Sequence, residues 1–82
     1  MDNGITLKIL DFKDGLTQYY NVKYIRIKSE KYNLMIFEKY IPIIGEINGS
    51  ITFEVDGETK ELENINGYYI NKKSTFDLIL KS

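Results

Sequence analysis

Apolar and polar residues alternate with a period of two along several stretches of the chain. The alternation is regular in residues 5–12, 24–28, 50–55 and 75–80. It is typical of β-strands that are buried on one face only. The apolar faces of these stretches consist of Ile5, Leu7, Ile9, Ile25, Ile27, Ile51, Phe53, Val55, Phe76, Leu78 and Leu80. Leu10 and Ile79 are apolar but fall on the opposite, polar parity.

Residues 16–28 form a longer β-prone stretch whose two parts are out of phase. Val22 is apolar on the parity opposite to the one that Ile25 and Ile27 share. This change of parity suggests a β-bulge or a change of register partway along the stretch.

Residues 29–40 allow two interpretations. Apolar residues recur at helical spacing after a serine that could cap a short helix. Alternatively, a polar turn leads into a short buried strand at residues 34–37. Pro42 forbids a helix running through it and pushes Ile41 into an extended conformation. We therefore favour the strand.

Four dipeptides are turn signals, and they separate the predicted strands: Asp14-Gly15, Asn48-Gly49, Asp56-Gly57 and Asn66-Gly67. Asp56-Gly57 is the strongest hairpin signal, because a type I′ turn needs positive φ at both central residues. The returning arm after it, residues 58–64, is mostly charged and is expected to face solvent or to lie at an edge of the sheet.

Turn signals at roughly 8–12-residue spacing, without a long helical pattern, are typical of small all-β domains. The sequence thus predicts an all-β fold, a small antiparallel β-sandwich or barrel of about 7–9 short strands. With 82 residues and no linker or repeat, residues 1–82 are expected to form a single domain.

The composition excludes several kinds of chemistry. The chain has no cysteine and no histidine, which removes thiolate nucleophiles, zinc ribbons and the commonest general base near neutral pH. Acidic residues gather around the Asp56-Gly57 hairpin, but without the frame of a calcium loop, so we interpret them as a solvated face. The isolated glycines form no phosphate-binding pattern. We expect no catalytic residues, no cofactor and no metal: a protein that is not an enzyme.

Charge and hydropathy bear on partners and location. Eleven basic and twelve acidic residues give a net charge of −1, which does not attract nucleic acid or an anionic membrane. A basic group comprising Lys23, Arg26, Lys28 and Lys31 lies near tyrosines and could bind single-stranded nucleic acid, but the charge balance favours ordinary outward strand residues. The chain has no signal peptide and no run of about 18 apolar residues, so we expect no membrane insertion and a cytoplasmic location.

Seven tyrosines make the chain tyrosine-rich for its length. Tyrosine is a good strand residue, and it is also enriched at protein interfaces because it combines area with a polar tip. Tyr40, Tyr68 and Tyr69, together with Pro42, are the residues that we expect to contact a partner protein.

The order of strands, turns and proline resembles the N-terminal β-sandwich domain of the epsilon subunit of rotary (F-type) ATP synthases. Residues 27–44, IKSEKYNLMIFEKYIPII, align without a gap with the family run Leu-Pro-Gly-Ser-Glu-Gly-Glu-Phe-Gly-Val-Leu-Pro-Gly-His-Ala-Pro-Leu-Leu. Pro42 falls on the family proline, Ile36-Phe37 on its Val-Leu and Ile43-Ile44 on its paired leucines.

The resemblance continues to the end of the chain. Residues 49–53 resemble the family's Gly-Val-Leu-Arg-Ile strand, Asp56-Gly57 its hairpin turn, and residues 65–70 its Val-Ser-Gly-Gly-Phe-Val. Several family glycines and the histidine are replaced, at Ser29, Tyr32, Met35, Lys39, Tyr40 and Tyr68. The turns that those glycines make in the family must therefore be built differently here.

The resemblance implies a docking role. In the family this sandwich packs against the gamma subunit and the membrane ring of the rotor. The implied partner is thus a gamma-like rotor subunit, and the implied location is peripheral to the membrane through that complex. Residues 1–82 contain no counterpart of the family's C-terminal helical hairpin, so its inhibitory and nucleotide-binding roles are not expected. The alternative is a diverged stand-alone module that self-associates and has no part in ATP synthesis.

Overall fold

The chain folds into seven β-strands, and the structure, a computed structural model, describes residues 4–81. The strands are β1 Ile5–Asp11, β2 Gly15–Val22, β3 Tyr24–Ser29, β4 Asn33–Phe37, β5 Ile43–Val55, β6 Glu58–Lys72 and β7 Thr75–Leu80. No helix occurs among the described residues. The predicted all-β class is confirmed.

The strands form one hydrogen-bonded sheet in the order β2-β1-β7-β6-β5-β3-β4. Neighbouring strands are antiparallel except β1 and β7, which are parallel, with Thr6 beside Thr75 and Leu10 beside Ile79. The sheet is therefore mixed, where the sequence predicts only antiparallel pairing. A parallel pair needs a long crossover, and here residues 12–74 supply it.

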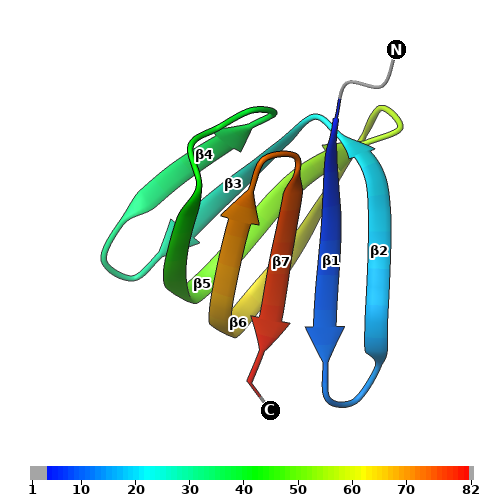
Figure 1. The fold of residues 1–82 in the computed structure, drawn as a ribbon. Coiled ribbons are helices and arrows are strands. Elements are labelled where there is room, and N and C mark those ends of the chain that lie inside the picture. Colours follow the sequence, from blue (N-terminus) through cyan, green and yellow to red (C-terminus); the bar gives the residue numbers. More distant parts are fainter. Residues whose placement is uncertain (1–3, 82) are drawn as a thin grey trace.

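The sheet folds into two layers because β5 and β6 are long and bend together (Figure 1). Residues 43–49 of β5 and 65–72 of β6 join β7, β1 and β2 in what we call the front layer. Residues 51–55 of β5 and 58–62 of β6 join β3 and β4 in the back layer. The β5–β6 register shifts between Gly49 and Ile51, and such a bulge increases local bending and twist.

The core fills the space between the layers. Its buried apolar side chains are Ile5, Leu7, Ile9, Val22, Ile25, Ile27, Ile36, Ile47, Ile51, Phe53, Val55, Tyr69, Phe76 and Leu78. The rings of Tyr19 in β2 and Phe53 in β5 pack across the layers, with centroids 5.0 Å apart. Apart from the partly buried Leu80, every residue that the alternation placed on an apolar face belongs to this core.

The segment before Pro42 is a strand. β3 ends at Ser29, a short turn follows, and β4 returns along β3. The favoured interpretation of residues 29–40 is confirmed, and the helical alternative is wrong. The predicted irregularity in residues 16–28 is also present: Asn21 has a φ of 59°, and β2 gives way to β3 at Lys23.

The Asp56-Gly57 hairpin is confirmed, with φ of 54° and 77° at the two central residues. Asn48-Gly49 and Asn66-Gly67 are not turns, because β5 and β6 continue as strands on both sides of them. Their glycines serve a different need. A Cβ on Gly49 would collide with the Lys28 carbonyl oxygen, and a Cβ on Gly67 with the Ile79 carbonyl oxygen. Glycine here allows a close approach of neighbouring strands.

Candidate protein interface

Exposed apolar side chains form a row across the outer face of the front layer. Tyr68 of β6 lies opposite Ile79 of β7, Ile79 beside Leu10 of β1, and Leu10 opposite Leu16 of β2. Directly opposed residues project from the same face of a sheet. These four side chains, which we call the outer apolar row, are between 41% and 54% exposed.

One further apolar residue extends this surface. Phe12, in the β1–β2 turn, is 80% exposed. A hollow of about 200 Å³ is lined by Leu10, Asp11, Phe12, Ile79 and Leu80. A second hollow of about 220 Å³ lies beside it, around Leu10, Leu16 and Ile79. Hollows with apolar walls offer places where side chains of a partner can insert.

Charged residues close one end of the row. The Lys81 ammonium lies 4.8 Å from the centre of the Tyr68 ring and 3.9 Å from a Glu46 carboxylate oxygen. Glu46 is directly opposite Tyr68 in the β5–β6 ladder. The row therefore has an apolar body and a polar end, a composition typical of the core and rim of an interface.

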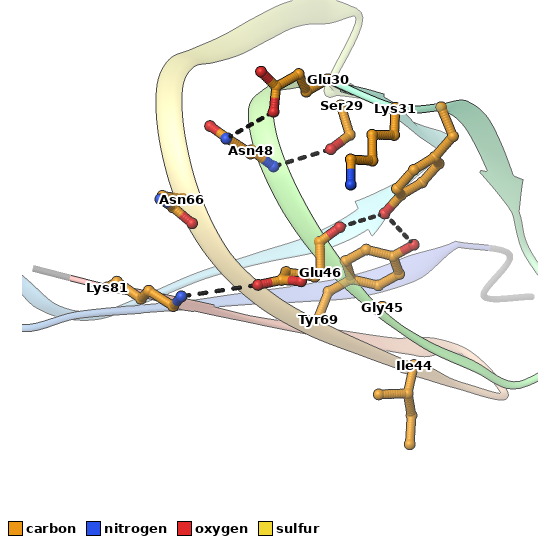
Figure 2. Close-up of a pocket in the computed structure, with 11 residues that line it drawn as sticks. Ser29, Glu30, Lys31, Ile44, Gly45, Glu46, Asn48, Asn66, Tyr69 and Lys81 are labelled. Atoms are coloured by element: carbon orange, nitrogen blue, oxygen red, sulfur yellow. Dashed lines mark hydrogen bonds and ion pairs between the residues drawn. The ribbon is translucent and has the colours of Figure 1, made fainter.

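A larger, polar groove of about 520 Å³ lies between the β3–β4 turn and residues 44–48 of β5 (Figure 2). Its floor includes the Tyr69 ring, which occupies the space above Gly45, where any Cβ would collide with the Tyr69 hydroxyl. The ring stacks on Phe76, with centroids 5.2 Å apart and an interplanar angle of 14°. Gly45 is thus needed to seat the tyrosine.

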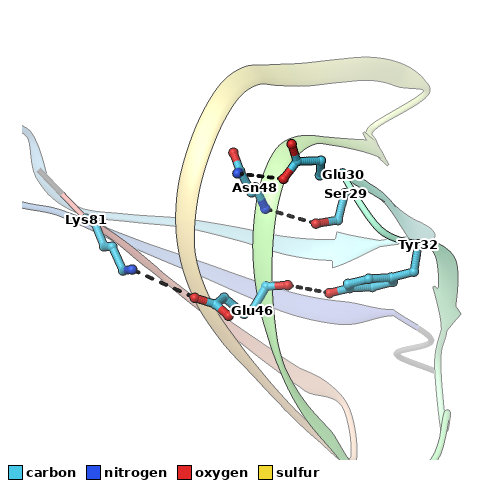
Figure 3. A network of polar contacts seen from close by, with 6 residues as sticks. All are labelled: Ser29, Glu30, Tyr32, Glu46, Asn48 and Lys81. Atoms are coloured by element: carbon cyan, nitrogen blue, oxygen red, sulfur yellow. Dashed lines mark hydrogen bonds and ion pairs between the residues drawn. The ribbon is translucent and has the colours of Figure 1, made fainter.

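Hydrogen bonds tie the β3–β4 turn to β5 across this groove (Figure 3). The Tyr32 hydroxyl donates to the Glu46 carbonyl oxygen at 2.6 Å. The Asn48 backbone N–H donates to the Ser29 Oγ at 3.0 Å, and the Glu30 N–H donates to the Asn48 carbonyl oxygen at 2.9 Å. These contacts satisfy backbone groups on the edge of β5 that faces away from β6.

The two tyrosine hydroxyls at the groove floor lie 2.8 Å apart. Because the single Tyr32 proton goes to Glu46, the Tyr69 hydroxyl is the donor in this pair. Burial, and then the hydrogen bond to Tyr32, raises the pKa of Tyr69 well above its ordinary value. Because its pKa is raised, Tyr69 stays protonated near neutral pH and cannot act as a general base there. The hydrogen bonds of the groove therefore have a structural role: they connect the β3–β4 turn to β5 and β6.

The acidic residues are not gathered into a metal site. Among residues 4–81, no group of three or more acidic side chains is arranged to hold a metal ion. The described part of the chain also contains no helix of the length and apolar content that a membrane crossing requires.

The four residues predicted to contact a partner lie in three places. Tyr40 and Pro42 line one hollow of about 390 Å³ in the β4–β5 link, which Asn71 fixes by donating to the Ile41 carbonyl oxygen at 3.2 Å. Tyr68 lies in the outer apolar row, whereas Tyr69 points into the core and is 3% exposed. The contact of all four with a partner stays a prediction.

Of the outer apolar row, only Tyr68 was predicted from the sequence to contact a partner. The signal was present, because Leu10 and Ile79 are apolar on the polar parity of their strands. What joins them into one surface is the parallel pairing of β1 with β7, which puts residues far apart in sequence side by side.

Comparison with known proteins supports the fold. No family model matches the chain, and no curated protein sequence matches it. A chain in the cryo-EM structure of the central stalk and c-ring of Tetrahymena thermophila mitochondrial ATP synthase has a similar structure, with a TM-score of 0.76 and 14% identity. The similarity covers 99% of this chain and 66% of the other, so this chain spans just under two thirds of its neighbour's length. At this identity the likeness establishes a shared all-β architecture.

Proposed function

We propose that this chain is a non-catalytic docking domain that binds a protein partner through the outer apolar row. The observation that carries the proposal is the alignment of Leu16, Leu10, Ile79 and Tyr68 across four adjacent strands, all of them exposed. The largest contiguous apolar patch on the surface of a protein is often its binding site.

The size of this face suits a protein partner. Strands in a sheet lie about 4.8 Å apart, so the five strands of the front layer span roughly 20 Å. The strands β1, β2 and β7 have 7, 8 and 6 residues, which at about 3.4 Å per residue gives the face a projected area of roughly 400–550 Å². That is the size of a small, transient interface, below about 600 Å² on each partner. The hollows beside Leu10 are shallow. They can accept side chains of a protein partner, but they do not enclose a ligand as a small-molecule site does.

The partner that we propose is a gamma-like subunit of a rotary ATP synthase, with contact to the membrane ring through the same complex. Two independent observations support it. The sequence resembles the epsilon-subunit sandwich from residue 27 to residue 70, and the fold is similar to a chain of an ATP synthase central stalk and c-ring structure. The domain would then lie at the membrane periphery, held there by its partner.

The test is binding of a purified gamma-like subunit, measured by co-elution and by calorimetry. Leu10→Lys/Ile79→Lys places two charges in the middle of the outer apolar row and is expected to weaken binding at least tenfold. Phe37→Lys is the matched control, because Phe37 is 53% exposed on the back layer. Failure of the unmodified protein to bind at micromolar concentration would reject the rotor partner.

The same face also supports a second function, self-association as a stand-alone module. An exposed apolar row can pair with its copy in a second chain, which would bury Leu10 and Ile79 on both sides. Light scattering separates the two functions. A dimeric mass that Leu10→Lys/Ile79→Lys reduces to one chain would favour self-association, and a constant monomeric mass would exclude it.

A further inference from the structure

The outer edge of β4 is an open strand edge in the back layer. β4 is the last strand in the sheet order and pairs with β3 alone. Ser29 and Tyr32 exchange both of their backbone hydrogen bonds. Antiparallel pairs alternate between bonded and non-bonded types, so Leu34 and Ile36 also bond to β3.

The remaining residues of β4 direct their backbone groups away from β3. The N–H and C=O groups of Asn33 and Met35, and the N–H of Phe37, therefore point to the open edge. Within residues 4–81, no other segment is hydrogen-bonded to these groups of Asn33 and Met35. They form a regular template for one more strand.

β4 lacks the features by which proteins protect an open edge. Natural edge strands carry lysines, prolines, bulges or inward charges that prevent pairing with another chain. The sequence of β4, NLMIF, has no charge and no proline, and its register with β3 is unbroken. Only its short length of 5 residues limits pairing.

Two cations lie beside this edge on the outer face of the back layer. Arg26 is opposite Met35, and Lys28 is opposite Asn33. Both side chains are exposed, and within residues 4–81 neither forms an ion pair. They line a hollow of about 320 Å³ together with Asn33, Leu34 and Met35. The cations therefore lie two strand spacings from the position that an added strand would take, on the same face of the layer.

We propose that the open edge of β4 receives an extended acidic segment of a partner protein as an additional strand. The backbone of that segment would bond to Asn33, Met35 and Phe37. A glutamate opposite Met35 would start about 10 Å from the Cα of Arg26, two strand spacings away, which the two long side chains together can span. Carboxylates at alternate positions of the segment would thus meet Arg26 and Lys28.

Charge selects this occupant over a second copy of the chain. A symmetric pairing of two β4 edges would bring the Arg26 and Lys28 pairs of both copies onto one face, with no carboxylate between them. On the same face, Glu54 of β5 and Glu61 of β6 lie on the side of β3 that is away from β4. The site is separate from the outer apolar row and does not depend on the function proposed for that row.

The probe is a capped, fluorescein-labelled peptide, Thr-Glu-Val-Glu-Val-Thr, compared with its lysine analogue Thr-Lys-Val-Lys-Val-Thr. We expect the glutamate peptide to bind in fluorescence anisotropy at low salt, and at least tenfold more tightly than the lysine peptide. Salt should weaken the binding, because the charges are exposed. In NMR spectra of the ¹⁵N-labelled protein, addition of the glutamate peptide should shift the amide signals of Asn33, Met35 and Phe37.

Two variants test the site separately. Met35→Pro removes an N–H that points to the open edge, where proline is tolerated because no existing ladder bond is lost. It should reduce binding at least tenfold with an unchanged circular dichroism spectrum. Arg26→Glu/Lys28→Glu should have the same effect. Lys13→Glu/Lys72→Glu changes the net charge equally at exposed positions away from β4 and should leave binding within about twofold.

The outcomes decide the proposal even if Met35→Pro does not fold, because the charge reversals and the amide shifts are independent of it. Equal binding of both peptides, shifts centred on β2, or an effect of the control as large as that of Arg26→Glu/Lys28→Glu would overturn it. A mass that rises with concentration and falls with Met35→Pro would show that a second copy occupies the edge, which also overturns it.

Discussion

A single hydroxyl group, that of Tyr32, connects three parts of the fold. It lies in the β3–β4 turn, donates to the Glu46 carbonyl oxygen of β5 at 2.6 Å and accepts from the Tyr69 hydroxyl of β6. Tyr69 in turn stacks on Phe76 of β7. The turn of the back layer is thereby attached to the front layer by polar contacts that end on the core residue Tyr69.

Removal of this hydroxyl should destabilise the protein. Tyr32→Phe is expected to lower the free energy of unfolding by about 1–2 kcal/mol, because two hydrogen bonds worth about 1 kcal/mol each are lost and Tyr69 is left without its acceptor. Tyr20→Phe is the matched control. Its hydroxyl donates only to the exposed Gln18, so its effect should stay within about 0.5 kcal/mol. Urea unfolding followed by circular dichroism measures both; equal effects would contradict the role given to Tyr32.

The raised pKa of Tyr69 makes the fold sensitive to alkali. Burial, with the Tyr32 hydrogen bond second, raises this pKa above its ordinary value of 10.0. The folded protein thus holds the proton more tightly than the unfolded chain. This contribution to stability is fully present below about pH 10 and is lost as the pH rises through the folded-state pKa.

We expect the free energy of unfolding to fall above about pH 10. Deprotonation of Tyr69 should contribute up to about 1.4 kcal/mol of this decrease per pH unit. Tyr69→Phe lacks this contribution, so its alkaline loss should be less steep. Urea unfolding of both proteins from about pH 8 to about pH 11 makes the comparison, and parallel curves would show that Tyr69 does not titrate differently on folding.

At the scale of elements, the bend of β5 at Gly49 produces the two layers. Residues before the bend pair within the front layer, and residues after it pair with β3 in the back layer. At the bend, Lys28 and Ser29 of β3 approach so closely that a Cβ on Gly49 would lie 3.2 Å from the Ser29 Cα and would collide with the Lys28 carbonyl oxygen. Because both groups are backbone, neither can move without shifting β3.

Gly49→Ala is therefore expected to destabilise the protein by about 1–3 kcal/mol, the range typical of an overpacked site. Ser50→Ala, at the next position, introduces no clash and should stay within about 0.5 kcal/mol. Thermal and urea unfolding measure the difference. A neutral Gly49→Ala would mean that β3 and β5 are farther apart at the bend than the structure has them.

Local patterns predicted faces better than they predicted pairing. Ile5, Leu7 and Phe53 are buried as their parity required, because alternation is a property of each strand alone. The two Asn-Gly pairs were wrongly predicted to be turns. Glycine is needed both in tight turns and where two strands approach closely, and only the position of the neighbouring strand distinguishes these two cases. At Asp56-Gly57 no such neighbour is within 4 Å of the glycine Cβ position, and the turn forms.

At the scale of the molecule, the candidate interface depends on topology that the sequence does not display. Tyr68 could be singled out because an exposed tyrosine is typical of interfaces. Leu10 and Ile79 could not be joined to it, because their proximity comes from the β1–β7 pairing. The open edge of β4 likewise follows from the strand order, in which nothing lies beyond β4.

The parallel pairing of β1 with β7 also affects how the protein is made. A ribosome delivers β1 and its hairpin partner β2 first, but the other neighbour of β1 is the last strand of the sheet. Until β7 has left the exit tunnel, the edge of β1 that faces β7 stays unpaired, and the front layer cannot close. Folding must then wait for nearly the whole domain to be synthesised, and a nascent chain held in this state is a natural client for chaperones.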